Sequence, residues 1–242
     1  IFGPILAGAL AGFGLLFPLY IAAALAATAT VVIARFLPPD LYHAGKHRIT
    51  SKLSVFVPRL RLYLFCSFGG FTGFSGIQQT LGFRLQDMLN LSGPETAQYT
   101  GISLMVTALT TFALQITVSQ RFTGPPIVLI RIGVALLLVG TLIIAATDTF
   151  VGVLIGMSAM GAGLGLAVPA IASAASLAVS PEEQGATAGL ATAVPAAGFV
   201  IGPVTCGALY TISPTLSALG AAGILVIVVV TALLGQRNKR YD

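Results

Sequence analysis

The chain has 242 residues, of which 56% are hydrophobic and only 8% are charged, and its mean hydropathy is +0.98. Soluble domains carry about a quarter charged residues, so this composition excludes a water-soluble globular protein and predicts a protein embedded in a bilayer. The formal net charge of +5 would suit a nucleic-acid-binding protein. The positions of the basic residues, described below, indicate membrane topology instead.

Seven segments are long and apolar enough to cross a hydrocarbon core of about 30 Å. Residues 1–11 precede them and are apolar but too short to span. Since no basic region precedes residues 1–11, we expect the end of a truncated helix there rather than a signal peptide. The pattern predicts an all-α, polytopic transmembrane helix bundle with about seven complete spans and one partial helix. The predicted spans are 12–34, 62–83, 97–118, 126–147, 149–178, 186–210 and 213–235.

The basic residues lie almost entirely on one side of these spans. Six of the twelve Lys and Arg fall between Arg35 and Arg61, Arg121 and Arg131 flank a connection on the same side, and three more follow the last span. Only Arg84 falls in a connection on the opposite side. Because cytoplasmic loops are enriched in Lys and Arg, we expect the 36–61 loop and the C-terminus to be cytoplasmic, in a plasma (inner) membrane.

Two stretches have the pattern of a helix N-terminal capping box. In Ser180-Pro181-Glu182-Glu183 and in Ser92-Gly93-Pro94-Glu95, a capping serine is followed three residues later by a glutamate. The two boxes account for three of the seven acidic residues without a catalytic role. The alternative for Glu182 and Glu183 is an ion pair with the basic cytoplasmic loop.

Chemically reactive side chains are scarce in the predicted spans. No Asp, Glu, Lys or His occupies the middle of any complete span, so the sequence shows neither a proton relay nor a catalytic cluster, and we predict that the chain is not an enzyme. His43 and His47 have helical i, i+4 spacing, but their basic neighbours disfavour a metal ion, so no metal or cofactor is expected. Cys66 and Cys206 stand singly in apolar stretches and are interpreted as packing residues.

Glycine and proline cluster in the predicted span at 186–210. Gly198 and Gly202 form a small-xxx-small pair, with prolines interspersed. Such a helix packs closely and bends, so we interpret it as a moving element, with simple tight packing as the alternative. Its GPVTCGAL sequence at 202–209 matches GPILAGAL at 3–10, 199 positions earlier. The recurrence indicates two parallel repeats of several spans, one arrangement found in secondary transporters.

On these features the chain resembles the major facilitator superfamily, and within it the drug/proton antiporters. The two Gly-Pro motifs are similar to the antiporter motif of the fifth helix and to its counterpart in the eleventh. The stretch at 119–124 resembles the second copy of the family's cytoplasmic loop signature, with Gln120 in place of the usual acid. The residues of the helix-packing motif would be Gly3, Pro4, Gly8, Gly198, Gly202, Pro203 and Gly207.

The resemblance implies two six-helix bundles that rock around a midplane cavity. Residues 1–35 would end the N-terminal bundle, 36–61 would be the central cytoplasmic loop, 62–235 the C-terminal bundle and 236–242 the tail. The spans at 62–83 and 149–178 would line the cavity, where aromatic, thioether and amide groups suit a bulky, largely apolar ligand. The candidate cavity residues are Phe71, Phe74, Gln78, Gln79, Gln115, Met157 and Met160, and the candidate cytoplasmic gate residues are Arg121, Glu182 and Glu183.

The implied function is secondary active transport by alternating access, with proton-coupled efflux of amphipathic or drug-like small molecules. The energy source would be a proton gradient, and its carboxylate would lie in four N-terminal helices that the 242 residues lack. The expected partners are a small-molecule substrate, the lipid bilayer and those N-terminal helices, and not nucleic acid. Two alternatives share the fold: a facilitator or importer of a small metabolite, and a non-transporting membrane receptor.

Overall fold

The computed structural model describes residues 17–36, which form one helix, and residues 57–235, which form helices joined by short connections. No strand occurs within these two ranges, which confirms the all-α prediction. The expectations for Gly3, Pro4, Gly8, His43 and His47 lie outside the described residues. The helices are α2 (Phe17–Phe36), α3 (Pro58–Leu89), α4 (Gly93–Leu114), α5 (Pro126–Ala146), α6 (Phe150–Leu177), α7 (Gln184–Tyr210) and α8 (Pro214–Leu234), with a short π-helix η3 (Gln115–Ser119) after α4 and a 3₁₀ turn η4 (Pro181–Glu183) before α7.

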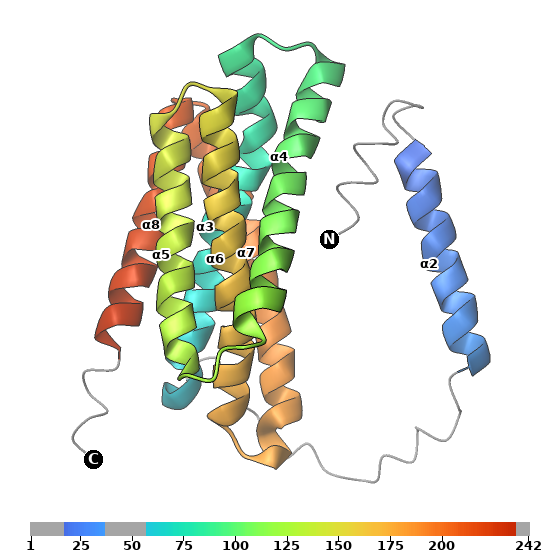
Figure 1. Cartoon of the computed structure of the whole chain (residues 1–242), viewed down its shortest axis with the longest axis vertical. Coiled ribbons are helices and arrows are strands. Elements are labelled where there is room, and N and C mark those ends of the chain that lie inside the picture. Colours follow the sequence, from blue (N-terminus) through green and yellow to red (C-terminus); the bar gives the residue numbers. More distant parts are fainter. Residues whose placement is uncertain (1–16, 37–56, 236–242) are drawn as a thin grey trace.

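Helices α3 to α8 pack as a six-helix bundle, and α2 stands apart from it (Figure 1). Helix α3 lies at the centre of the bundle, since it contacts each of the other five helices. The most extensive remaining contacts join α5 to α6 and α8, and α4 to α6. In Figure 1 the end of α3 at Leu89 and the end of α7 at Tyr210 lie at the top, which we call the upper end of the bundle, and the Pro58 end of α3 lies at the lower end.

Five of the described helical segments are long and apolar enough to cross a membrane: those that contain α4, α5, α6, α7 and α8. Helix α3, predicted as a span, does not meet this criterion, although its 32 residues extend over about 48 Å. Polar residues lower the mean hydropathy of α3. Several of them are buried inside the bundle rather than exposed on its surface: Ser67, Thr72, Ser75 and Thr80. The first predicted span corresponds to α2, an apolar helix of 20 residues.

Helices α5 and α6 approach each other through glycines on both sides. A Cβ atom at Gly133 would lie 2.7 Å from the carbonyl oxygen of Gly163, and one at Gly156 would lie 2.8 Å from that of Gly140. Real Cβ atoms do not come this close to a backbone oxygen, so larger residues would force the helices apart. Small residues that bring helix backbones together are a common device in membrane bundles. The α5–α6 pair is therefore closely packed along its length.

Both predicted capping boxes are present. The backbone N–H of Ser92 donates to Glu95 Oε2 at 2.9 Å, and that of Ser180 donates to Glu183 Oε2 at 3.1 Å. Each carboxylate thus satisfies a backbone donor at a helix start, where the helix dipole also favours negative charge.

Candidate functional site

The close contact between α3 and α7 is centred on the predicted glycine pair. A Cβ atom on Gly202 would lie 2.9 Å from the backbone nitrogen of Gly76, and closer still to the carbonyl oxygen of Thr72. Ser75 Oγ donates a hydrogen bond to the carbonyl oxygen of Gly198 at 3.2 Å. Gly198 and Gly202 therefore bring the α7 backbone against α3, where a serine hydroxyl of α3 reaches it.

An ion pair joins α3 and α7 at the lower end. Arg59 lies in the first turn of α3, and its guanidinium is 2.5 Å from Glu183 Oε1, just before α7. The pairing of this glutamate with a basic residue at the edge of the 36–61 loop is thus present in the structure. Among the described residues, Arg121 belongs to no ion pair and is exposed in the α4–α5 connection, and Glu182 is exposed in η4. The structure therefore brings Glu183 to Arg59 and not to Arg121.

A hydrogen bond joins the same two helices at the upper end. The hydroxyl of Tyr210, the last residue of α7, donates to Asp87 Oδ2 at 2.5 Å. The rings of Phe83 and Tyr210 are 6.0 Å apart. Asp87 lies beyond the predicted span at 62–83. Because α3 continues to Leu89, Asp87 is helical and shares a face with Phe83 one turn earlier.

A cavity of about 610 Å³ opens between α3 and α7 at this upper end, and we call it the α3–α7 cavity. Gln79, a predicted cavity residue, lines it, and its role in substrate binding stays a prediction. Gly207 also lines it, and a Cβ atom there would meet nothing within 4 Å. Gly207 is thus not a close-packing position against the described helices, unlike Gly202. The lining residues are Gln79, Thr80, Phe83, Asp87, Pro203, Gly207, Tyr210 and Thr211.

Two of the other predicted cavity residues pack against α7. The rings of Phe71 and Phe74 lie 5.4 and 6.4 Å from the ring of Phe199. Gln78 is half-buried, and its Oε1 atom is buried without a hydrogen-bond partner. Gln115 begins η3 at the lower end of α4, away from the α3–α7 cavity. The structure therefore does not gather these side chains into one site.

Met157 and Met160 are core residues rather than cavity residues. Both are fully buried. Thr107 Oγ1 of α4 donates to the carbonyl oxygen of Met157 at 3.2 Å, and Thr141 Oγ1 of α5 lies 3.9 Å from the sulfur of Met160. Because α6 is packed between α4 and α5, its methionines fill the space between these helices. Their predicted role in substrate binding stays a prediction, and in this structure both side chains are buried.

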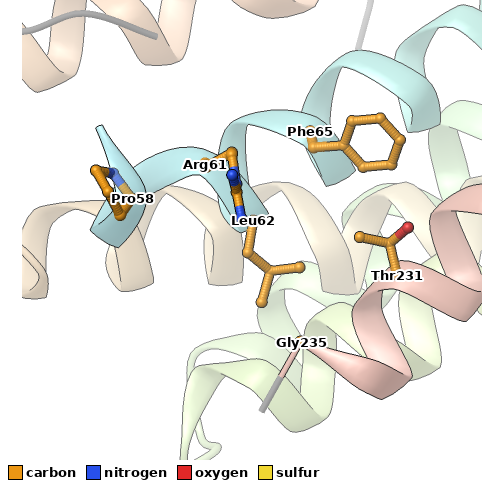
Figure 2. A pocket seen from close by; sticks show the side chains of 6 residues that line it. All are labelled: Pro58, Arg61, Leu62, Phe65, Thr231 and Gly235. Carbon is orange, nitrogen blue, oxygen red and sulfur yellow. The ribbon is translucent and has the colours of Figure 1, made fainter. Parts of the chain in front are cut away.

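A second cavity, of about 390 Å³, lies at the lower end between the start of α3 and the end of α8. Figure 2 shows Leu62 extending from α3 toward the end of α8 near Gly235, with Phe65 farther along α3 on the side of Thr231. Among the described residues that line it, Arg61 is the charged one.

Neither cysteine forms a disulfide. Cys66 and Cys206 are both free and buried, as expected of packing residues. Within residues 17–36 and 57–235, no group of three or more His, Cys, Asp or Glu side chains is placed to hold a metal ion.

Comparison with known proteins places this architecture in a family. The model of the Major Facilitator Superfamily matches residues 1–203. Among solved structures, the human organic anion transporter MFSD10 (TETRAN) is similar with a TM-score of 0.63 and 18% sequence identity, over 72% of this chain and 40% of that chain. At this identity the likeness concerns the fold, and this chain spans less than half of that transporter's length. No curated protein sequence gives a significant match. The chain belongs to the Major Facilitator Superfamily, a family of membrane transporters and not of enzymes.

Proposed function

We propose that this chain is part of a secondary active transporter that works by alternating access and exports amphipathic or drug-like small molecules in exchange for protons. The observation that carries the alternating-access part is a mismatch between hydropathy and burial in the bundle. Of the five apolar spans, those containing α4 and α7 are the least apolar and also the least buried. A bundle facing lipid on all sides would expose its most apolar helices instead.

The side chains on the exposed faces make this contrast specific. Helix α8 exposes large apolar side chains, such as Ile227, Val230 and Leu233. Helix α7 exposes small and polar ones in its first half, such as Thr192 and Ala196, whereas its second half exposes Val200 and Val204. Small residues allow another helix to approach closely, and a threonine hydroxyl is satisfied by water or by a facing helix. This fits a bundle whose α4 and α7 faces meet a second bundle across a substrate pathway.

Two observations support the finer parts of the proposal. The Gly-Pro motif of α7 resembles the antiporter motif, which favours exchange over simple facilitation. Basic residues gather on one side of the spans, namely Arg59, Arg61 and Arg121 at the lower end of the bundle and Arg35 at the end of α2. Because cytoplasmic loops are enriched in Lys and Arg, this favours a cytoplasmic lower end in a plasma (inner) membrane. Since no described span carries an acidic residue in its middle, we place the coupling carboxylate outside the described residues, in the part of the N-terminal bundle that would precede α2.

The test is a flux assay in everted membrane vesicles that contain the protein. We expect a fluorescent amphipathic dye to accumulate when a proton gradient is imposed, and the accumulation to collapse when a protonophore is added. Flux that persists at full rate without the gradient would indicate a facilitator. Absence of flux in vesicles with correctly inserted protein would indicate a receptor.

A further inference from the structure

We propose that the cavity of about 390 Å³ between the start of α3 and the end of α8 binds one anionic phospholipid of the bilayer, with Arg61 as the partner of the lipid phosphate. We call this cavity the α3–α8 cavity. The lipid is held and not carried, so the site is independent of the transport function proposed above. The residues that line the cavity, labelled in Figure 2, are Pro58, Arg61, Leu62, Phe65, Thr231 and Gly235.

Helices α3 and α8 touch along most of their length and leave an open space at their lower ends. Farther up, a Cβ atom on Gly73 would lie 2.7 Å from Leu225 Cγ, and one on Gly69 would meet Val228. Residues four apart lie on the same side of a helix, so Phe65 and Arg61 continue the row of α3 that contains the two glycines. Phe65 remains 36% exposed there. The α3–α8 cavity is thus the part of this helix contact that no side chain of the described residues fills.

Arg61 gives the cavity its positive charge. It is exposed, and among the described residues no acid lies within ion-pair distance of it. Arg59 in the same helical turn is instead held by Glu183. The start of α3 adds partial positive charge, because the helix begins at Pro58 without a side-chain hydrogen bond to cap it. The rim of the cavity on the α3 side therefore favours an anion.

The end of α8 would by itself oppose an anion, because a helix C-terminus carries partial negative charge. Arg131 of α5 offsets this, since it donates to the carbonyl oxygens of Ala232 and Leu233 at 3.0 and 3.3 Å. Arg61 is therefore not needed to cap α8, and its N–H groups are available to a ligand. A guanidinium binds a phosphate through two parallel hydrogen bonds.

The depth of the cavity favours a lipid over a soluble phosphate. The apolar span of α8 ends at Leu234, next to the lining residue Gly235. The cavity therefore lies at the level where the hydrocarbon core gives way to the head groups. Basic pockets between transmembrane helices at this level on the cytoplasmic side are typical binding sites for anionic head groups.

The remaining lining suits an acyl chain. Leu62 and Phe65 form an apolar wall on α3, and Phe65 lies about 6 Å farther along the helix axis than Arg61. Thr231 Oγ1 donates to the carbonyl oxygen of Ile227 at 2.7 Å, so its hydroxyl proton is already used within α8. Beyond the cavity the exposed surface of α8 continues with Ile227 and Val230. A phosphate at Arg61 can thus extend its acyl chain along apolar side chains toward the middle of the bilayer.

The test is binding of phosphatidylglycerol to the delipidated full chain in a mild detergent, measured by native mass spectrometry. Phosphatidylcholine with the same acyl chains is the comparison without net charge. We compare Arg61→Gln with Arg121→Gln, because Arg121 is also exposed at the lower end and does not line the cavity. We expect one saturable phosphatidylglycerol per chain, bound about fivefold more tightly than phosphatidylcholine. Arg61→Gln should lose this preference and Arg121→Gln should keep it.

A second variant and a soluble probe separate a lipid site from a phosphate site. Thr231→Phe places a ring in the cavity and leaves Arg61 unchanged, so it should weaken phosphatidylglycerol binding about fivefold or more. Glycerol 3-phosphate carries the phosphate without acyl chains. It should not displace the lipid at concentrations at which phosphatidylglycerol saturates the site.

Four results would overturn the proposal: equal affinity of the unmodified chain for the two lipids, an unchanged preference in Arg61→Gln, the same loss in Arg121→Gln, or displacement of the lipid by glycerol 3-phosphate. The last would indicate a site for a soluble phosphate. Thermal unfolding shows whether each variant is folded, and the comparison of the two lipids needs no variant. Since no flux is measured, failure of this site leaves the proposed transport function standing, and the reverse also holds.

Discussion

A comparison of Gly202→Ala with Gly207→Ala tests whether the two glycines of the motif differ in their surroundings, with Gly202 in close contact with α3 and Gly207 in open space. The new methyl group at position 202 would lie 2.9 Å from the Gly76 nitrogen and nearer still to the Thr72 carbonyl oxygen, so α7 must move away from α3. Overpacking of a well-filled contact costs about 1–3 kcal/mol, and the lost hydrogen bond from Ser75 to Gly198 costs about 1 kcal/mol. We therefore expect Gly202→Ala to lower the free energy of unfolding by about 2–4 kcal/mol.

The same change at Gly207 meets no atom within 4 Å. Alanine has a higher helix propensity than glycine by up to about 1 kcal/mol, so Gly207→Ala should be neutral or stabilising. For a protein of this size, about 1 kcal/mol corresponds to about 2–4 °C in Tm. Thermal unfolding in a mild detergent should thus separate the two variants by about 4–20 °C. Equal Tm values for the two variants would refute the claim that α3 and α7 touch at Gly202 and diverge at Gly207.

Three further predictions concern the ends and the core of the bundle. Glu183→Gln should make thermal stability less sensitive to added salt than in the unmodified chain, because it removes the charge of an ion pair that salt screens; an unchanged salt dependence would count against that pair. Arg84→Leu should lower the free energy of unfolding by no more than about 3 kcal/mol. The variant loses the hydrogen bond to Thr147, but it also removes a buried Nε atom that has no partner. A larger loss in a denaturation curve would contradict this balance. Met160→Ala should cost about 2–5 kcal/mol of stability, since Met160 is fully buried, whereas Gln79→Ala, at an exposed position, should change the free energy of unfolding by no more than about 0.5 kcal/mol; equal losses of stability in thermal unfolding would contradict this difference.

The boundaries of the predicted spans were set by hydropathy, and α3 shows where hydropathy misleads. Its apolar character falls after Phe83, so the span was ended there. The helix nevertheless continues to Leu89 and stops at Asn90, whose φ of 52° is a left-handed conformation that asparagine tolerates. The polar end of α3 stays helical because Arg84 is buried against Thr147 and Asp87 is held by Tyr210. Neither partner is a local neighbour, so no window along the sequence reveals it.

Sequence patterns predict the structure correctly where the interactions join residues that are close in the sequence. The capping boxes at Ser92 and Ser180 require only four consecutive residues, and both are present. The glycine motif predicted close packing, but its partner helix depends on the fold: Gly202 meets α3, and Gly207 opens onto a cavity. The thioether of Met157 predicts a contact with an apolar ligand. In the structure this side chain is buried, because α6 packs between α4 and α5.

Cysteine labelling decides most directly whether the exposed face of α7 borders a substrate pathway rather than lipid. Single cysteines are introduced at Thr192 and Ala196 on α7, and at Ile227 and Val230 on α8, in membranes treated with a water-soluble maleimide. The native Cys66 and Cys206 are buried, which keeps the background low. We predict rapid labelling at the two α7 positions and little at the two α8 positions. Equal protection of all four positions would mean that both helices face lipid, and the proposed pathway along α7 would have to be abandoned.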